Sequence, residues 1–367
     1  MGKYKVSVYA ICKNEVAFAE RWMASMSEAD EVVVLDTGSE DGTPARLRQL
    51  GARVQVEQIT PWRFDVARNR SLELVHEDAE ICVCTDLDEV FRPGWRQALE
   101  ESWRPEAGRA GYRYIWSFEP DGSEGVSFRG EKIHSRHGWR WKHPVHEVLT
   151  WTGDGRPGIW VEAAGVQLEH YPDHTKSRGQ YLPLLELSVE ECPTDDRNMH
   201  YLGREYFYHK RWDDCIRTLT RHLALPTALW ADERAASMRY MAGAYEHKGN
   251  VGQAERWHLS AVAQAPHLRE TWLDFALFLQ RQEQWDGVVY ATGRALDIRH
   301  RTDSYITQGS AWGSLPWDLR SVALYHTGRL EQALEAVERA RTLNMQDERI
   351  ANNREFIQKA LKEKMQD

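Results

Sequence analysis

The sequence has little of what marks secreted, membrane-spanning or zinc-binding proteins. Its five cysteines are odd in number, and none are spaced as a Cys-x-x-Cys pair. No run of about eighteen apolar residues is present. The first residues, MGKYKVSVYA, lack the apolar core of a signal peptide. We therefore predict a cytoplasmic protein with reduced thiols, no structural zinc site and no transmembrane segment.

An excess of positive charge is also missing. The chain has 47 Lys and Arg residues against 56 Asp and Glu residues, a net charge of −9, so no nucleic-acid partner is expected. Aromatic residues, in contrast, are plentiful, with 16 Trp and 14 Tyr. Surfaces that stack on sugars would use them, and so would the core of a helical repeat. A length of 367 residues suggests two domains.

The first half of the chain, to about residue 190, alternates short apolar strands with helical patterns. We expect strands at 5–11, 31–36, 52–59 and 81–88, with helices at 15–27, 43–51 and 63–77. This alternation predicts an α/β domain with a mainly parallel sheet. Such sheets bind ligands beyond the carboxyl ends of their strands. Acidic residues follow two of the predicted strands at that edge.

The second half, from about residue 195, is helical throughout and repeats with a period of about 34 residues. Ala254, Ala261 and Pro266 occupy the small and helix-ending positions of a helix–turn–helix unit. The pattern predicts four tetratricopeptide-like units, with an insertion around 303–316. Repeats of this kind present a concave binding surface, and they could also form a homodimer.

Two acidic segments of the first half need an explanation. ICVCTDLDEVF (81–91) places Asp86, Asp88 and Glu89 within four positions, where they repel each other unless positive charge meets them. A solvated turn is one interpretation, and a bound divalent cation is the other. VVVLDTGSEDGT (32–43) is either a capped turn between a strand and a helix or part of a nucleotide site. It lacks the GKS or GKT of a phosphate-binding P-loop.

Four motifs together resemble the family 2 glycosyltransferases of the GT-A fold. They are KNE (13–15), DTGSEDGT (36–43), FDVARN (64–69) and DLDE (86–89), in that order. The second half is similar to the tetratricopeptide tails of a subset that includes bacteriocin peptide S-glycosyltransferases, and HPVHE (143–147) resembles a segment of lipopolysaccharide-core glycosyltransferases. The resemblance implies a GT-A domain over 1–190 and a tetratricopeptide-like domain over 195–367.

The resemblance also implies a metal-dependent, inverting transfer of a hexose from a UDP-sugar, with UDP-glucose the commonest donor. The implied nucleotide-sugar contacts are Asn14, Glu15, Asp36, Arg68, Asn69 and Asp86. For Arg68, the alternative is a simple helical pair with Asp65. Asp88 would bind Mn²⁺ or Mg²⁺ together with His146 or His170.

The base that deprotonates the acceptor would be Glu147 or Asp173, and Lys176 and Arg178 could hold the diphosphate. His146 and Glu147 can serve one site only if they lie in a loop, because strand neighbours face opposite sides. The repeats favour a peptide or protein acceptor. Two alternatives remain: a saccharide or lipid-linked acceptor, and a catalytically silent GT-A domain that serves as an interaction scaffold.

Overall fold

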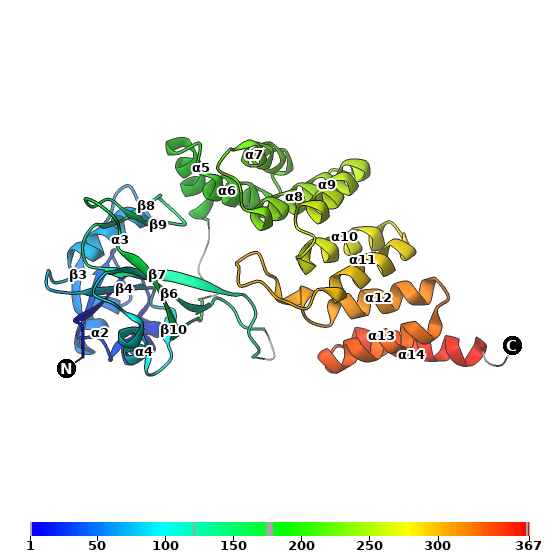
Figure 1. The fold of residues 1–367 in the computed structure, drawn as a ribbon, viewed down its shortest axis with the longest axis horizontal. Helices are drawn as coiled ribbons and strands as arrows, with labels where there is room; N and C mark the ends of the chain where they lie inside the picture. The colour runs from blue at the N-terminus through cyan, green and yellow to red at the C-terminus, as the bar shows by residue number, and fades with distance from the viewer. Residues whose placement is uncertain (1, 120–121, 174–178, 365, 367) are drawn as a thin grey trace. The chain divides into compact units, whose positions relative to one another are not determined.

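The computed structural model describes residues 2–119, 122–173, 179–364 and 366. The chain divides into two compact units, Met1–Glu191 and Cys192–Asp367 (Figure 1). The first unit is α/β and the second is a helical repeat, which confirms the predicted fold class.

The first unit is built on one eight-stranded sheet. Its order is β3 (Arg53–Val56), β2 (Glu31–Asp36), β1 (Val6–Cys12), β4 (Ile81–Thr85), β7 (Ser127–Ser135), β6 (Ala107–Ile115), β10 (Ile159–His170) and β5 (Glu89–Phe91). The four strands predicted from the sequence pair in parallel. β7 runs antiparallel to both β4 and β6, and β5 runs antiparallel to β10. These antiparallel strands were not anticipated by the sequence.

Helices cover the sheet, and a short hairpin follows β7. The helices that pack on the strands are α1 (Val16–Met26), α2 (Thr43–Gln49), α3 (Phe64–Glu73) and α4 (Trp95–Ser102). A fifth helix, α5 (Tyr181–Glu191), follows β10, and its Tyr181 ring lies beside Phe64 at the start of α3. The hairpin consists of β8 (Trp139–Lys142) and β9 (Val148–Trp151). Strand β1 is buried on both faces: Val8 belongs to the cluster around Trp22, and Tyr9 belongs to the cluster around Trp141. Because successive side chains of a strand point to opposite faces of the sheet, β1 contributes to two separate hydrophobic cores.

The second unit consists of paired helices. They are α6 (Asp196–Tyr208) and α7 (Trp212–Ala224), α8 (Ala231–His247) and α9 (Val251–Gln264), α10 (Arg269–Arg281) and α11 (Trp285–Asp297), and α12 (Leu315–His326) and α13 (Leu330–Leu343), followed by α14 (Glu348–Lys364). Each helix packs on the next. The predicted small positions are fully buried, as at Ala254 and Ala261. Gly203 lets α6 approach α7, since a Cβ there would lie 2.2 Å from Leu219.

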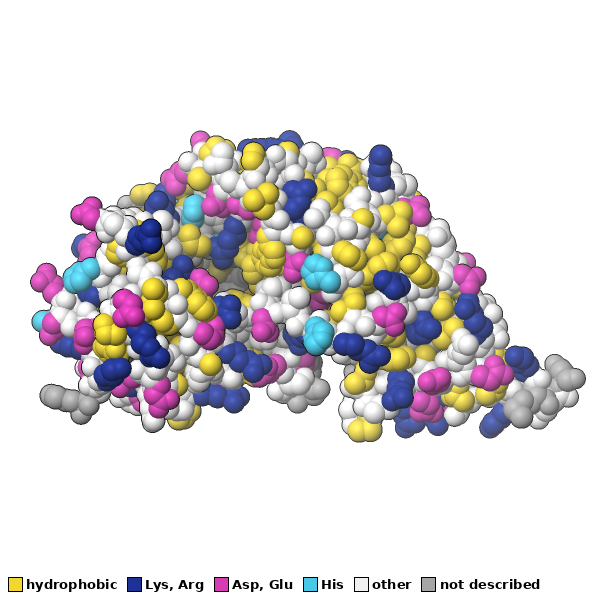
Figure 2. All heavy atoms as spheres, viewed as in Figure 1, with side chains coloured by type: hydrophobic (Ala, Val, Ile, Leu, Met, Phe, Trp, Pro, Cys, Tyr) yellow, Lys and Arg dark blue, Asp and Glu magenta, His cyan; other side chains and the backbone are white. Residues whose placement is uncertain are grey.

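Hydrophobic and charged side chains are mixed on the visible face of the second unit (Figure 2). Leu229, Tyr290 and Met345 are among its exposed apolar residues. Single exposed apolar side chains are common on folded proteins, so none of them alone marks a binding site. Among the described residues, no helix combines the length and the apolar character needed to cross a membrane.

Candidate active site

Three turns of the first unit meet at one edge of the sheet. The register pairs Cys12 with Asp36 and Ala10 with Thr85, so β1, β2 and β4 end close together. The turn after each strand therefore lies at the edge where parallel sheets bind ligands. Asp36, Asp86 and Asp88 all follow or end these strands.

Asp36 shapes the turn after β2. Its side chain is fully buried and accepts hydrogen bonds from the backbone N–H groups of Gly38 (3.0 Å) and Ser39 (2.8 Å). The Ser39 hydroxyl donates to its second oxygen at 2.5 Å. The carboxylate is thus closed to solvent here, and its predicted contact with uracil or ribose stays a prediction.

Asn14 and Glu15 tie the turn after β1 to the turn after β2. Asn14 has a left-handed backbone (φ 54°), which Asn tolerates better than most residues. Its N–H donates to the Ser39 hydroxyl, and its side-chain oxygen accepts from the N–H of Glu40, both at 2.7 Å. The Glu15 N–H donates to Thr43 at 2.8 Å. These bonds connect the two turns at the edge of the sheet where the resemblance implies that a nucleotide binds.

The crowded acids after β4 are met by two internal cations. Arg68 on α3, only 6% exposed, donates to both carboxylate oxygens of Asp86 at 2.9 and 3.1 Å, and it also pairs with Glu147. Lys132 on β7 lies 3.0 Å from Asp86 and 3.0 Å from Glu89. We call these five residues the charge cluster. Lys132 was not among the site residues predicted from the sequence.

Asp86 and Lys132 of the charge cluster stay charged at neutral pH. Burial alone would raise the pKa of Asp86, but Arg68 and Lys132 outweigh it and hold that pKa below its ordinary value. Burial likewise opposes the charge on Lys132, yet Asp86 and Glu89 raise its pKa. Arg68 does not form the helical pair with Asp65 that the sequence offered as an alternative, because Asp65 pairs with Arg63 at 2.9 Å.

Asp88 has a different partner, His170. The antiparallel pairing of β5 with β10 sets His170 opposite Glu89 and brings its Nε2 to 3.3 Å from the Asp88 carboxylate. Nδ1 of His170 lies 2.9 Å from the backbone oxygen of Trp116, which can accept its proton. This bond fixes the ring with Nε2 toward Asp88, as expected for a histidine that binds a metal. Burial opposes protonation of His170, but Asp88 raises its pKa overall.

Part of the first unit matches a known protein family. Residues 7–137 match the family model described as glycosyl transferase family 2. The chain carries a family 2 glycosyltransferase domain. The match spans the strand ends, the Asp86–Glu89 segment and Lys132, whereas Glu147 and His170 lie beyond it.

The chain is also similar to several repeat proteins. A TPR repeat-containing protein of Synechococcus elongatus is 28% identical over 148 residues, which are 40% of this chain and 35% of that relative. The chain thus spans about a third of that relative's length. Among solved structures, a MamA protein is 13% identical (47% of this chain and 87% of that one, TM-score 0.37). Yeast Tom70 is 15% identical (52% and 38%, TM-score 0.39).

The three predicted metal ligands of the family 2 domain do not form one group. Among the described residues, no cluster of three or more His, Cys, Asp or Glu side chains could hold a metal ion. His170 is the histidine that meets Asp88, whereas the ring of His146 lies 5.9 Å from that of Tyr181. The expected loop is present, since His146 follows β8 with a left-handed backbone (φ 49°).

The remaining predicted residues have varied surroundings. Asn69 holds the hairpin in place: its amide group exchanges two 2.9 Å hydrogen bonds with the backbone of Trp141. Glu147 is 10% exposed beside Arg68. Asp173 is half-buried, three residues after His170. Lys176 and Arg178 lie outside the described residues.

An aromatic surface adjoins Asp88 and His170. Trp116 is 41% exposed, and its ring stacks on that of His170 with centroids 5.9 Å apart and planes 26° apart. Tyr171, 37% exposed, stacks on Phe118 at 5.4 Å. Local sequence patterns gave no sign that Trp116 would lie beside His170, since the two are 54 positions apart.

Proposed function

We propose that this protein is a metal-dependent, inverting glycosyltransferase. It moves a hexose from a UDP-sugar, with UDP-glucose the expected donor, to a peptide or protein acceptor that the helical repeats help to dock. The observation that carries the proposal is the convergence of Asp88 and His170 at the ligand-binding edge of a family 2 domain. The donor, the metal and the acceptor are the proposed elements.

The side chains beside Asp88 suit a divalent cation. Asp88 offers a carboxylate oxygen, and His170 offers an imidazole nitrogen already oriented by the Trp116 carbonyl. Two protein ligands suffice where substrate phosphates and water supply the others. An imidazole ligand favours Mn²⁺ over Mg²⁺. A bound cation would offset the negative charge of the departing diphosphate.

A single displacement needs one base at the acceptor. Glu147 is poorly suited, since Arg68 already holds its carboxylate in a nearly buried ion pair. We assign this role to Asp173 because it lies three residues after His170, the proposed metal ligand at the end of β10. Asp173→Asn should reduce transfer to the acceptor while leaving Mn²⁺ binding unchanged, and unchanged transfer would return the role to Glu147.

The first experiment is Asp88→Asn, assayed by Mn²⁺-dependent hydrolysis of UDP-glucose. Loss of a charged ligand at the leaving group should lower kcat by about 10²-fold or more. Glu40→Gln is the matched control, because Glu40 is an exposed acid on the same edge of the sheet. Turnover of Asp88→Asn close to that of the control would contradict the metal assignment.

A second candidate is a catalytically silent domain that serves as an interaction scaffold. The charge cluster favours it in one respect: Arg68 and Lys132 neutralise most of the crowded acids without any ligand. Calorimetry with UDP and Mn²⁺ separates the two candidates. UDP binding that requires the metal supports the enzyme, and absence of metal-dependent binding supports the scaffold.

A saccharide acceptor is favoured over a peptide by one observation, the exposed ring of Trp116 beside His170. Mass spectrometry after incubation with UDP-glucose and separate pools of peptides and oligosaccharides decides between them. Transfer to oligosaccharides alone would remove the proposed acceptor role of the repeats.

A further inference from the structure

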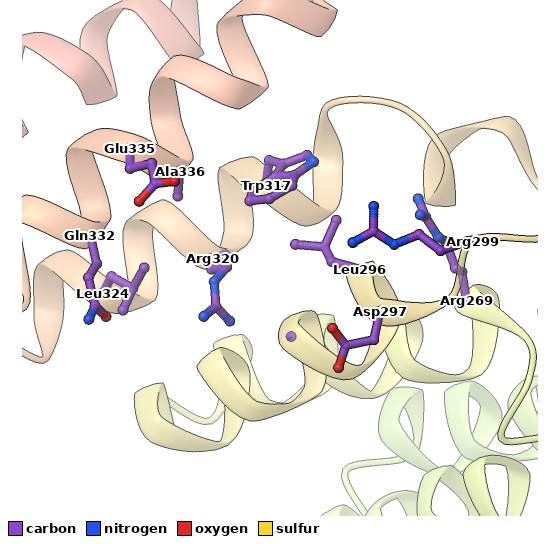
Figure 3. Close-up of a pocket in the computed structure, with 11 residues that line it drawn as sticks. Arg269, Leu296, Asp297, Arg299, Trp317, Arg320, Leu324, Gln332, Glu335 and Ala336 are labelled. Carbon is purple, nitrogen blue, oxygen red and sulfur yellow. The ribbon is translucent and has the colours of Figure 1, made fainter.

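A groove in the second unit has no part in the proposed transfer. It has a volume of about 490 Å³ and lies among α11, α12 and α13 (Figure 3). Three arginines, Arg269, Arg299 and Arg320, line it together with the apolar side chains of Trp317 and Leu296. Figure 3 shows Arg320 at the middle of the groove, with Trp317 and Leu296 beside it.

The arginines of the groove lack carboxylate partners. Arg269 donates to the backbone oxygen of Ile298 at 2.9 and 2.7 Å, and Arg320 donates to that of Val289 at 2.7 Å. Within the described chain, no carboxylate oxygen lies within 4.0 Å of Arg269, Arg299 or Arg320. Burial lowers the pKa of both Arg269 and Arg320, so their positive charge is incompletely compensated.

The helix beneath Arg320 leaves room for it. Gly293 lies within α11, where glycine is less favourable than alanine. A Cβ at this position would lie 3.1 Å from a terminal nitrogen of Arg320. The missing side chain therefore lets the guanidinium rest against the helix and reach the Val289 carbonyl.

We propose that this groove binds an acidic polypeptide segment that carries an apolar residue next to its carboxylate. Arginine suits carboxylates because its planar group can donate two parallel hydrogen bonds. Trp317 and Leu296 provide the apolar contact, and the volume is in the range of sites for small ligands. Asp297 and Glu335 also line the groove and would repel a carboxylate placed away from the arginines.

A polypeptide fits the groove better than a free inorganic anion does. A phosphate ion could neutralise the arginines, but it would leave Trp317 and Leu296 uncovered. A polypeptide with alternating acidic and apolar side chains could pair with the arginines and also cover Trp317 and Leu296. The site does not depend on the proposed glycosyl transfer, because all of its residues belong to the second unit.

The test is fluorescence anisotropy of the full chain with two dye-labelled peptides, one of alternating Glu and Leu and one of alternating Gln and Leu. The Glu peptide should bind saturably, and the Gln peptide should bind at least about tenfold more weakly. Arg299→Gln should weaken the Glu peptide by about tenfold. Arg299 is exposed and has no hydrogen bond or ion pair within the described chain, so its loss should not disturb folding.

Arg281→Gln is the matched control, since Arg281 is a half-exposed repeat arginine already paired with Glu246 at 2.8 Å. Its affinity for the Glu peptide should equal that of the unmodified protein. Three results would overturn the proposal: no binding, equal binding of both peptides, or equal weakening by Arg281→Gln. Displacement of the Glu peptide by inorganic phosphate at equal concentration would also overturn it, in favour of a small-anion site. Hydrolysis of UDP-glucose by Arg299→Gln serves as a separate readout and should be unchanged.

Discussion

Asp86 and Asp88 are two residues apart, similarly exposed (31% and 21%), and differently partnered. Asp86 is held by Arg68 and Lys132, which belong to the protein itself. Among the described side chains, His170 is the only one that forms a hydrogen bond or ion pair with the Asp88 carboxylate. The sequence suggested that one external cation relieves the whole acidic cluster. In the structure, Arg68 and Lys132 pair with Asp86 and Glu89, whereas Asp88 pairs with His170, and a cation bound at Asp88 stays a proposal.

Lys132→Met gives the largest expected effect. The change leaves Glu89, 1% exposed, beside Asp86 with no ion-pair partner among the residues that the structure describes. Removing one partner from a buried ion pair is costly, and we expect a loss of about 3 kcal/mol in unfolding free energy. Urea unfolding of the full chain measures it, with hydrogen exchange in β4 and β7 to assign the transition to the first unit.

The control for this change lies on the same strand. Arg129 on β7 pairs with Glu162 at 2.8 Å, and both side chains are well exposed. Arg129→Met should cost less than about 1 kcal/mol. Equal losses for the two variants would mean that the charge cluster behaves as a surface pair, and the contrast with Asp88 would disappear.

The sequence predicted the positions of the acids but not their partners. Asp36 and Asp86 follow buried apolar runs, and such local patterns identify strand ends. Lys132 is 46 positions from Asp86, and it arrives because β7 pairs antiparallel with β4. Nothing in a local pattern specifies a long-range pairing of this kind. The same holds for His170, which is 82 positions from Asp88.

His170→Ala tests the role of the residue that pairs with Asp88. If His170 binds the metal beside Asp88, its loss should weaken Mn²⁺ binding in the presence of UDP by about 10- to 100-fold. The unfolding free energy should change by less than about 1 kcal/mol, because no buried charge is left alone. Calorimetric titration with Mn²⁺ measures the affinity. His146→Ala is the control, and weaker binding by that variant instead would reverse the choice of ligand.

The repeats show why the second unit was easier to predict. The helix pairs can be identified from the local spacing of residues, because small residues such as Ala254 and Ala261 recur where the helices touch. The helix predicted at 43–51 rests on similar local grounds, and Gly51, which follows α2, has the left-handed backbone common at helix ends (φ 102°). The groove beside Arg320 was not predicted, because its arginines come from three separate segments: Arg269 begins α10, Arg299 follows α11, and Arg320 lies on α12.

The pH dependence of the Lys132→Met effect is a smaller test. The pKa of Asp86 is lower in the folded chain than in the unfolded one, so its ion pairs stabilise the fold fully above about pH 4. Their contribution falls as the pH drops through the folded-state pKa. In Lys132→Met, Asp86 loses one of the two cations that lower its pKa, so it takes up a proton at a higher pH than in the unmodified protein. The loss should therefore shrink by about 1 kcal/mol between about pH 7 and pH 4 in urea unfolding. A constant loss would show that charge is not its cause.

Trp116→Ala carries the smallest expected effect on the metal site. The backbone oxygen of Trp116, which the substitution retains, holds Nδ1 of His170, whereas the indole ring only stacks on the imidazole. Mn²⁺ affinity should therefore stay within about twofold of the unmodified protein, a change worth under about 0.5 kcal/mol. Trp116→Phe is the control, since it keeps an aromatic ring in the same place. A tenfold loss with Ala but not with Phe would mean that ring stacking, and not the carbonyl, orients His170. The contrast between Asp86 and Asp88 would then depend on an exposed side chain and not on the pairing of β5 with β10.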